Sequence, residues 1–210
     1  MGSSSSRVAF RLLLVTDSYD RSTAARVEAA LAALPAGMAA VQLRAKALEG
    51  GALQAAAAQL AALAHARGAL LVVNDRADVA LASGADGVHL PTRGLPVATV
   101  RRWLGDRLIL GASTHSLAEA QAACAGGADY VTFGPVYATA SKVGLGHPVG
   151  VDALAAAVRA LPLPLFALGG VDAARARDCV AVGARVACIG AVLGRDDAAD
   201  GARALAGAFG

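Results

Sequence analysis

Short apolar runs alternate with longer amphipathic or alanine-rich segments along the whole chain. Each run has the length of a buried strand and ends at glycine or at a polar residue, and each following segment is rich in helix formers. The runs recur about every 20 to 30 residues, a spacing typical of successive strand–helix units. The eight runs span residues 10–16, 39–43, 69–73, 87–90, 107–112, 130–133, 164–168 and 186–189.

Eight strand–helix units in succession predict an α/β fold, a single (β/α)8 TIM barrel over residues 9–210. Residues 1–8 contain a run of serines after Met-Gly, and we expect them to be a disordered or tag-like N-terminus. A doubly wound open sheet is the rival fold. It normally carries a glycine-rich signature after its first strand, where this chain has Thr16 and Asp17.

The last two apolar runs each end in a glycine-rich turn. Gly169 and Gly170 follow the seventh run and precede Asp172, a residue suited to cap a helix, while Gly190 follows the eighth run. Glycine lets backbone N–H groups approach an anion closely, and such turns late in a barrel are typical of a phosphate site. The sequence therefore predicts phosphate-binding turns after strands 7 and 8, although glycines that only form tight turns would give the same pattern.

Other polar residues mark the expected helix boundaries. We expect Ser22 and Ser116 to cap two helices, and a final helix that starts at Asp196 or Asp197 to cover the end of the barrel. Gly-Ala pairs precede three strands and indicate helix ends rather than a repeat array; they begin at Gly84, Gly127 and Gly183.

Composition and charge narrow the class of protein. The chain has 210 residues, is 56% hydrophobic and carries a net charge of +3. Its alanine-rich segment, residues 54–69, is interrupted by polar residues, which argues against a membrane span, and residues 1–6 lack the apolar core of a signal peptide. Arginine is spread too evenly for a nucleic-acid stripe but suits an anionic small molecule. We therefore expect a cytoplasmic protein that binds phosphorylated small molecules, without nucleic-acid or membrane partners, and that could form a homo-oligomer.

Polar side chains gather where the predicted strands end, which is the active-site end of a TIM barrel. Gln42, Arg44 and Lys46 alternate along the second strand and its extension, so all three point to one side. Two cations on an inward face need an anionic partner. Further candidates follow strands three, five and six: Asn74, Asp75, Ser113, His115, Thr139, Ser141 and Lys142. Together these groups could hold a diphosphate.

Structural roles are the alternative for each of these residues. Arg44 and Lys46 could pair with Asp75 in an ion-pair network, and Asp75 could instead cap the helix that follows it. His89 and His115 could be hydrogen-bonded residues at the rim of the barrel rather than catalysts.

An ordered set of motifs, running from about residue 12 to residue 193, resembles the thiamine phosphate synthase/TenI family. The motifs are Val41-Gln42-Leu43-Arg44-Ala45-Lys46, Val73-Asn74-Asp75-Arg76, Gly84-Ala85-Asp86-Gly87-Val88-His89-Leu90, Ser113-Thr114-His115-Ser116, Gly127-Ala128-Asp129-Tyr130-Val131, Phe133-Gly134-Pro135-Val136 and Leu168-Gly169-Gly170-Val171. The family fold is a TIM barrel. The resemblance implies a thiamine-biosynthesis enzyme that joins hydroxymethylpyrimidine diphosphate to a thiazole phosphate with Mg²⁺ and releases diphosphate.

The resemblance also implies residue roles. Gln42 would contact the pyrimidine, Asp75 would bind Mg²⁺, and the thiazole phosphate would lie on Gly169, Gly170 and Gly190. Residues implied to hold the diphosphate are Arg44, Lys46, Asn74, Ser113, Thr139, Ser141 and Lys142. Among these, Arg44, Lys46, Ser113 and Lys142 are the candidate catalytic residues, because they would stabilise the departing diphosphate.

The chain departs from the family pattern at three positions. Gly94 stands where the synthases carry a second Mg²⁺-binding Asp, so the metal site is expected to be weakened. Gly190 replaces an expected Ser, and Pro135 occupies the position of the catalytic His of a related thiazole tautomerase. Two alternatives therefore stay open. One is a tautomerase with His89 or His115 as the proton-transfer group. The other is a non-catalytic barrel that binds thiazole phosphate or thiamine phosphate.

Overall fold

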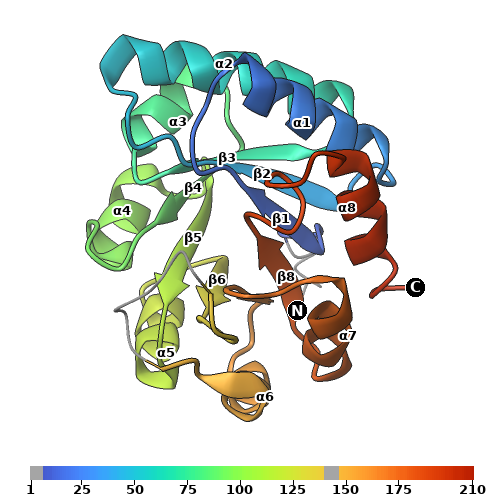
Figure 1. Ribbon diagram of the computed structural model, residues 1–210. Coiled ribbons are helices and arrows are strands. Elements are labelled where there is room, and N and C mark those ends of the chain that lie inside the picture. Colours follow the sequence, from blue (N-terminus) through green and yellow to red (C-terminus); the bar gives the residue numbers. More distant parts are fainter. Residues whose placement is uncertain (1–6, 140–146) are drawn as a thin grey trace.

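The computed structural model describes residues 7–139 and 147–210, which form a closed barrel of eight parallel strands with helices around it (Figure 1). The predicted TIM barrel is confirmed. The strands are β1 (Leu12–Val15), β2 (Ala39–Leu43), β3 (Leu70–Asn74), β4 (Gly87–Leu90), β5 (Ile109–Thr114), β6 (Tyr130–Phe133), β7 (Leu165–Ala167) and β8 (Arg185–Cys188). The helices are α1 (Arg21–Ala32), α2 (Gly50–Ala66), α3 (Ala77–Ser83), α4 (Val97–Leu104), α5 (Leu117–Ala125), α6 (Gly150–Ala160), α7 (Ala173–Ala181) and α8 (Ala198–Ala206).

The strand register decides which side chains enter the barrel. Neighbouring strands pair in parallel, and β1 pairs with β8 to close the barrel. Successive side chains of a strand point to opposite faces. One set fills the barrel interior, where Phe10, Tyr130 and Phe166 form the aromatic centre of a small core. The other set packs outward against the helices in the larger core. Interior positions near the carboxyl ends of the strands are therefore the ones that can face a substrate.

The amino-terminal end of the barrel is closed by the segment before β1. Val8 and Phe10 are buried, and the Arg185 side chain donates to their carbonyl oxygens at 2.7 and 2.6 Å. Residues 7 and 8, the described part of the predicted N-terminal extension, thus pack on the barrel. The final helix was expected to cover the barrel end, and this expectation is wrong. Instead α8 lies beside α1 in the outer layer (Figure 1).

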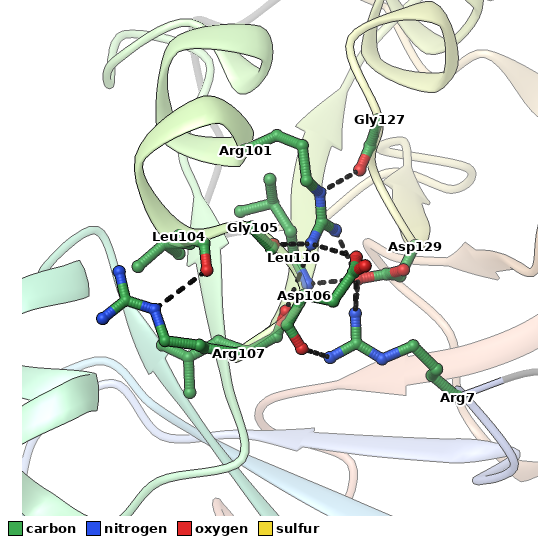
Figure 2. Close-up of polar contacts among 10 residues, drawn as sticks. Arg7, Arg101, Leu104, Gly105, Asp106, Arg107, Leu110, Gly127 and Asp129 are labelled. Carbon is green, nitrogen blue, oxygen red and sulfur yellow. Dashed lines mark hydrogen bonds and ion pairs between the residues drawn. The ribbon is translucent and has the colours of Figure 1, made fainter.

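An ion-pair cluster holds the same end together (Figure 2). The Asp129 carboxylate accepts from the Leu110 backbone N–H at 2.7 Å and from Arg101 at 2.6 Å, and it lies 3.5 Å from Arg7. Asp86 repeats the pattern one strand pair earlier, since its carboxylate accepts from the Leu71 N–H at 2.8 Å. The Gly-Ala-Asp motifs therefore do more than end helices, because each Asp ties the start of its strand to the preceding strand.

Three of the four expected helix caps form as predicted. Ser116, Asp172 and Asp197 each accept a backbone N–H of the first helical turn, as predicted. The expected cap at Ser22 is wrong, because Asp20 accepts from the backbone N–H of Thr23 at 2.7 Å and α1 begins one residue before Ser22. No helix within residues 7–139 and 147–210 is both long and apolar enough to cross a membrane.

Candidate active site

Polar side chains occupy interior positions near the ends of several strands. Gln42 on β2 and His89 on β4 are buried, while Asn74 on β3 and Ser113 on β5 are partly buried. The register places Asn74 beside His89, and Ser113 lies two positions beyond the partner of His89, so these residues share the interior face. The predicted grouping of Gln42, Asn74 and Ser113 at the barrel mouth therefore agrees with the register.

Hydrogen bonds connect His89 to Ser113 on β5 and to Tyr130 on β6. His89 Nε2 lies 2.9 Å from Ser113 Oγ, and His89 Nδ1 lies 3.0 Å from the Tyr130 hydroxyl. Burial lowers the pKa of His89 to about 3, so its imidazole is neutral. Burial raises the pKa of Tyr130, and a hydrogen bond from Gln42 opposes that shift. His89 thus lies inside the barrel, not at the rim as one alternative held, and it is hydrogen-bonded as expected.

Tyr130 is a member of this group that was not among the predicted site residues. Its ring occupies space that is free only because Gly111 on the neighbouring β5 has no side chain, since a Cβ there would overlap the phenol ring. A glycine inside a strand often marks close approach of another group. Gly111 was therefore the available sequence signal.

Arg44 and Lys46 extend the mouth of the barrel beyond β2. The Arg44 backbone N–H donates to Thr16 Oγ1 at 2.9 Å, and Thr16 Oγ1 donates back to the Arg44 carbonyl at 3.3 Å, which fixes where the residue leaves the strand. Arg44 is half-buried and Lys46 is exposed. Within the described part of the chain neither side chain forms an ion pair, so the predicted network with Asp75 is wrong.

Asp75 does not cap α3 either. The capping position is Arg76, and no side chain accepts a hydrogen bond there. Asp75 has a φ of 67°, and its N–H donates to the His89 carbonyl at 2.8 Å, which prolongs the β3–β4 ladder. Its exposed carboxylate stays at the mouth and forms no ion pair with another described residue.

Gly94 lies directly beside Asp75. A Cβ at Gly94 would be 3.0 Å from Asp75 Oδ1, so a side chain at position 94 would meet the Asp75 carboxylate. This is the position where the sequence lacks the expected second acid. In residues 7–139 and 147–210, no group of three or more His, Cys, Asp or Glu side chains could hold a metal ion. A cation here would have Asp75 as its protein carboxylate and would need oxygen ligands from a substrate.

The turns after β7 and β8 line a cavity of about 150 Å³. Gly169, Gly170 and Gly190 border it, and Thr139 reaches it from the segment after β6. The backbone N–H groups of the three glycines donate no hydrogen bond to any described residue. Unpaired N–H groups around a small cavity are suited to bind a phosphate.

The segment after β6 fixes the shape of this cavity. Gly169 has a φ of 97°, and a Cβ there would lie 2.6 Å from the Pro135 Cβ. Gly170 has a φ of 66°, and a Cβ there would lie 2.9 Å from the Tyr137 Cβ. The N–H groups of Val136 and Tyr137 donate to the Leu168 and Gly169 carbonyls at 2.9 and 3.0 Å. Glycine is therefore required at both positions by backbone conformation and by contact.

The remaining candidates lie outside the interior group formed by Gln42, Asn74, His89 and Ser113. His115 is half-buried at the rim, where its Nδ1 lies 3.3 Å from Thr92 Oγ1 and 3.3 Å from Glu119 Oε2. Its expected alternative role as a hydrogen-bonded rim residue fits this position. Ser141 and Lys142 lie outside the described residues.

Comparisons with known proteins agree with this geometry. A thiamine-phosphate synthase of Anaeromyxobacter dehalogenans is 45% identical over 184 residues, which cover 87% of this chain and 82% of that protein. A thiamine-phosphate synthase of Methanoculleus marisnigri is 43% identical over 197 residues, which cover 93% of each. The solved structure of a thiamine phosphate pyrophosphorylase from Pyrococcus furiosus matches with a TM-score of 0.82 and 29% identity over 96% of each chain. Residues 12–192 match the family described as thiamine monophosphate synthase, and the chain belongs to that family.

Proposed function

We propose that this protein is a thiamine phosphate synthase, which couples hydroxymethylpyrimidine diphosphate to a thiazole phosphate and releases diphosphate. One observation carries the proposal: two features at the barrel mouth are each suited to bind an anion. Gly169, Gly170 and Gly190 line a cavity, and the cations Arg44 and Lys46, which form no ion pair with another residue of 7–139 or 147–210, extend from β2. A reaction between two phosphorylated substrates would use both.

The proposed chemistry requires charge stabilisation rather than a protein nucleophile. The carbon–oxygen bond to the diphosphate breaks with its electron pair leaving on oxygen, and the thiazole nitrogen then supplies the pair for the new carbon–nitrogen bond. No proton has to be removed in either step. Arg44, Lys46, Ser113 and Lys142 are assigned to the departing diphosphate, and Gln42 to the pyrimidine. Asn74, Thr139 and Ser141 are assigned as further hydrogen-bond donors to the same diphosphate.

Asp75 is the proposed Mg²⁺ ligand of the protein. Mg²⁺ commonly binds through one or two carboxylates, several waters and the oxygens of a substrate phosphate, and a single exposed Asp75 fits that arrangement. The ion would neutralise charge on the diphosphate when bound. Because Gly94 contributes no carboxylate beside Asp75, we infer that Mg²⁺ binds together with the diphosphate and only weakly without it.

The tautomerase alternative has less support. His89 is neutral and engaged at both ring nitrogens, and His115 lies at the rim next to Glu119. His89 lies inside the barrel but has no ring nitrogen left for proton transfer, and His115 lies away from the interior residues. The cytoplasmic location, the lack of nucleic-acid and membrane partners, and the assembly state stay predictions.

The test is a coupling assay with hydroxymethylpyrimidine diphosphate, thiazole phosphate and Mg²⁺, following thiamine phosphate and diphosphate. We expect turnover that Asp75→Asn reduces at least tenfold. Asp106→Asn is the control, because Asp106 is an exposed acid in the cluster at the opposite end of the barrel. Absence of turnover in a folded protein that still binds thiazole phosphate would contradict the synthase proposal and favour the carrier. Turnover of a thiazole carboxylate phosphate tautomer would favour the isomerase.

A further inference from the structure

A buried line of polar side chains joins a residue assigned to the pyrimidine with a residue assigned to the diphosphate of the proposed substrate. It runs from Gln42, assigned to the pyrimidine, through Tyr130 and His89 to Ser113, assigned to the diphosphate. Tyr130 and His89, in the middle of this line, are assigned to no part of the substrate, and both are fully buried. Their hydrogen bonds are nevertheless the ones that decide how Ser113 can act.

Counting protons leaves two arrangements. A neutral imidazole has one N–H donor and one acceptor nitrogen. In the first arrangement the Tyr130 hydroxyl donates to Nδ1, and Nε2–H donates to Ser113 Oγ. In the second, Nδ1–H donates to Tyr130, and the Ser113 hydroxyl donates to Nε2. Only the first leaves the Ser113 proton free to point out of the barrel interior.

Burial of the phenol favours the first arrangement. The Tyr130 hydroxyl is fully buried, so its proton needs an acceptor inside the barrel, and His89 Nδ1 lies 3.0 Å away. Ser113 is only partly buried, so its hydroxyl can donate to a ligand instead. In addition, an anion beside Ser113 is attracted by a hydroxyl proton and repelled by the lone pairs that the second arrangement would present.

We propose that Tyr130 and His89 are positioning residues that hold His89 in the Nε2–H tautomer, so that Ser113 is kept as a hydrogen-bond donor to the diphosphate. The inference rests on the proposed function for the identity of the anion.

The tautomer itself is measurable without any turnover. Nitrogen-15 NMR of the imidazole rings distinguishes a protonated from an unprotonated nitrogen, and comparison with His89→Gln assigns the His89 signals. We expect a protonated Nε2 and an unprotonated Nδ1, both in the free protein and with inorganic diphosphate and Mg²⁺. A protonated Nδ1 in either state overturns the proposal, whatever the activity of the protein.

Two substitutions separate the positioning role from a packing role. The amide nitrogen of glutamine can occupy the place of Nε2, whereas the shorter asparagine reaches only the place of Nδ1. His89→Gln should therefore keep inorganic diphosphate binding within about threefold, and His89→Asn should weaken it about tenfold or more, the loss expected for a hydrogen bond to a charged group. Binding of inorganic phosphate, read as the control for the glycine-lined cavity, should change in neither.

A double-mutant cycle with Ser113→Ala completes the test. The Ser113→Ala penalty on diphosphate binding should largely disappear in the His89→Asn background, because the hydroxyl is no longer oriented. His65→Gln is the matched histidine control, since His65 pairs with Asp86 on the outer layer. Additive penalties, or equal losses of phosphate and diphosphate binding in His89→Asn, would overturn the proposal. Failure of the wild-type protein to bind diphosphate would instead overturn the proposed function, and the tautomer measurement would still decide the hydrogen-bond direction.

Discussion

A carboxylate added at position 94 is expected to create the metal site that this chain lacks. Gly94→Asp would place its Cβ 3.0 Å from Asp75 Oδ1, with the Pro91 Cδ and carbonyl oxygen at 3.0 and 3.1 Å. These contacts are tight, so the loop must shift by a few tenths of an ångström. Gly94 does not adopt a positive φ, so the backbone itself accepts a side chain. Gly94→Asn has the same shape without the charge and separates packing from electrostatics.

The electrostatic cost can be worked from the geometry. Two like charges about 4 Å apart repel by about 1 kcal/mol in water, the limit that applies to an exposed carboxylate such as Asp75. In a domain of this size about 1 kcal/mol corresponds to a melting temperature about 2 to 4 °C lower. Mg²⁺ bound between the carboxylates should reverse this loss, because a ligand that binds only the folded state stabilises it.

The assay combines thermal unfolding with calorimetric Mg²⁺ titration. Without Mg²⁺ we expect Gly94→Asp to melt below Gly94→Asn, and with millimolar Mg²⁺ we expect the order to reverse. Mg²⁺ should bind Gly94→Asp about tenfold more tightly than the wild type when inorganic diphosphate is absent. Equal Mg²⁺ affinity of Gly94→Asp and Gly94→Asn would refute the reasoning, because the new carboxylate would then not share an ion with Asp75.

Three further predictions test the fold and the site. Asp129→Asn should lower the free energy of unfolding in urea by about 2 to 3 kcal/mol, because the Asp129 carboxylate accepts two short hydrogen bonds. Asp106→Asn should change it little, and equal losses in the two variants would contradict the role of the cluster. Gly169→Ala should weaken thiazole phosphate binding at least tenfold in calorimetry, because a Cβ there would lie 2.6 Å from a proline Cβ, while diphosphate binding should be kept. Gly190→Ala serves as the reference, because a Cβ there meets open space and should preserve the fold. The pKa of His89 is lowered from 6.5 to about 3, so its contribution to stability is complete above about pH 6.5 and is lost as the pH falls toward 3. Between about pH 7 and 5 the wild type should lose about 2 kcal/mol more stability than His89→Gln, and parallel losses would contradict a buried neutral imidazole.

Local signals were sufficient for the number of strands and for most helix starts. Asp172 and Ser116 cap the helices that they precede, because each has a backbone in the extended region and an oxygen within reach of the first turn. Asp20 and Ser22 are both good capping residues two positions apart, and the sequence pattern alone could not decide between them. The final helix could not be placed either, because its contact with α1 depends on closure of the barrel.

The site was predictable where it depends on strand alternation and not where it depends on contacts between strands. Gln42 and Ser113 follow from their place at strand ends. Tyr130 does not, because its role requires both the space beside Gly111, which lacks a side chain, and the imidazole of His89 on another strand. The alternative capping role of Asp75 failed for a related reason. The residue continues the backbone ladder to β4 before the chain turns, and a sequence cannot show that partner.

The two ends of the barrel treat charge in opposite ways. At the amino-terminal end, Arg7 and Arg101 meet Asp129 within 3.5 and 2.6 Å, and the arginines are satisfied by the protein itself (Figure 2). At the carboxyl end, Arg44 and Lys46 have no carboxylate partner among residues 7–139 and 147–210. A partly buried cation such as Arg44 is costly to a fold without a counter-charge, unless a ligand supplies the negative charge, whereas the exposed Lys46 is solvated. The position of Arg44 is therefore an electrostatic argument for an anionic ligand at the mouth of this barrel.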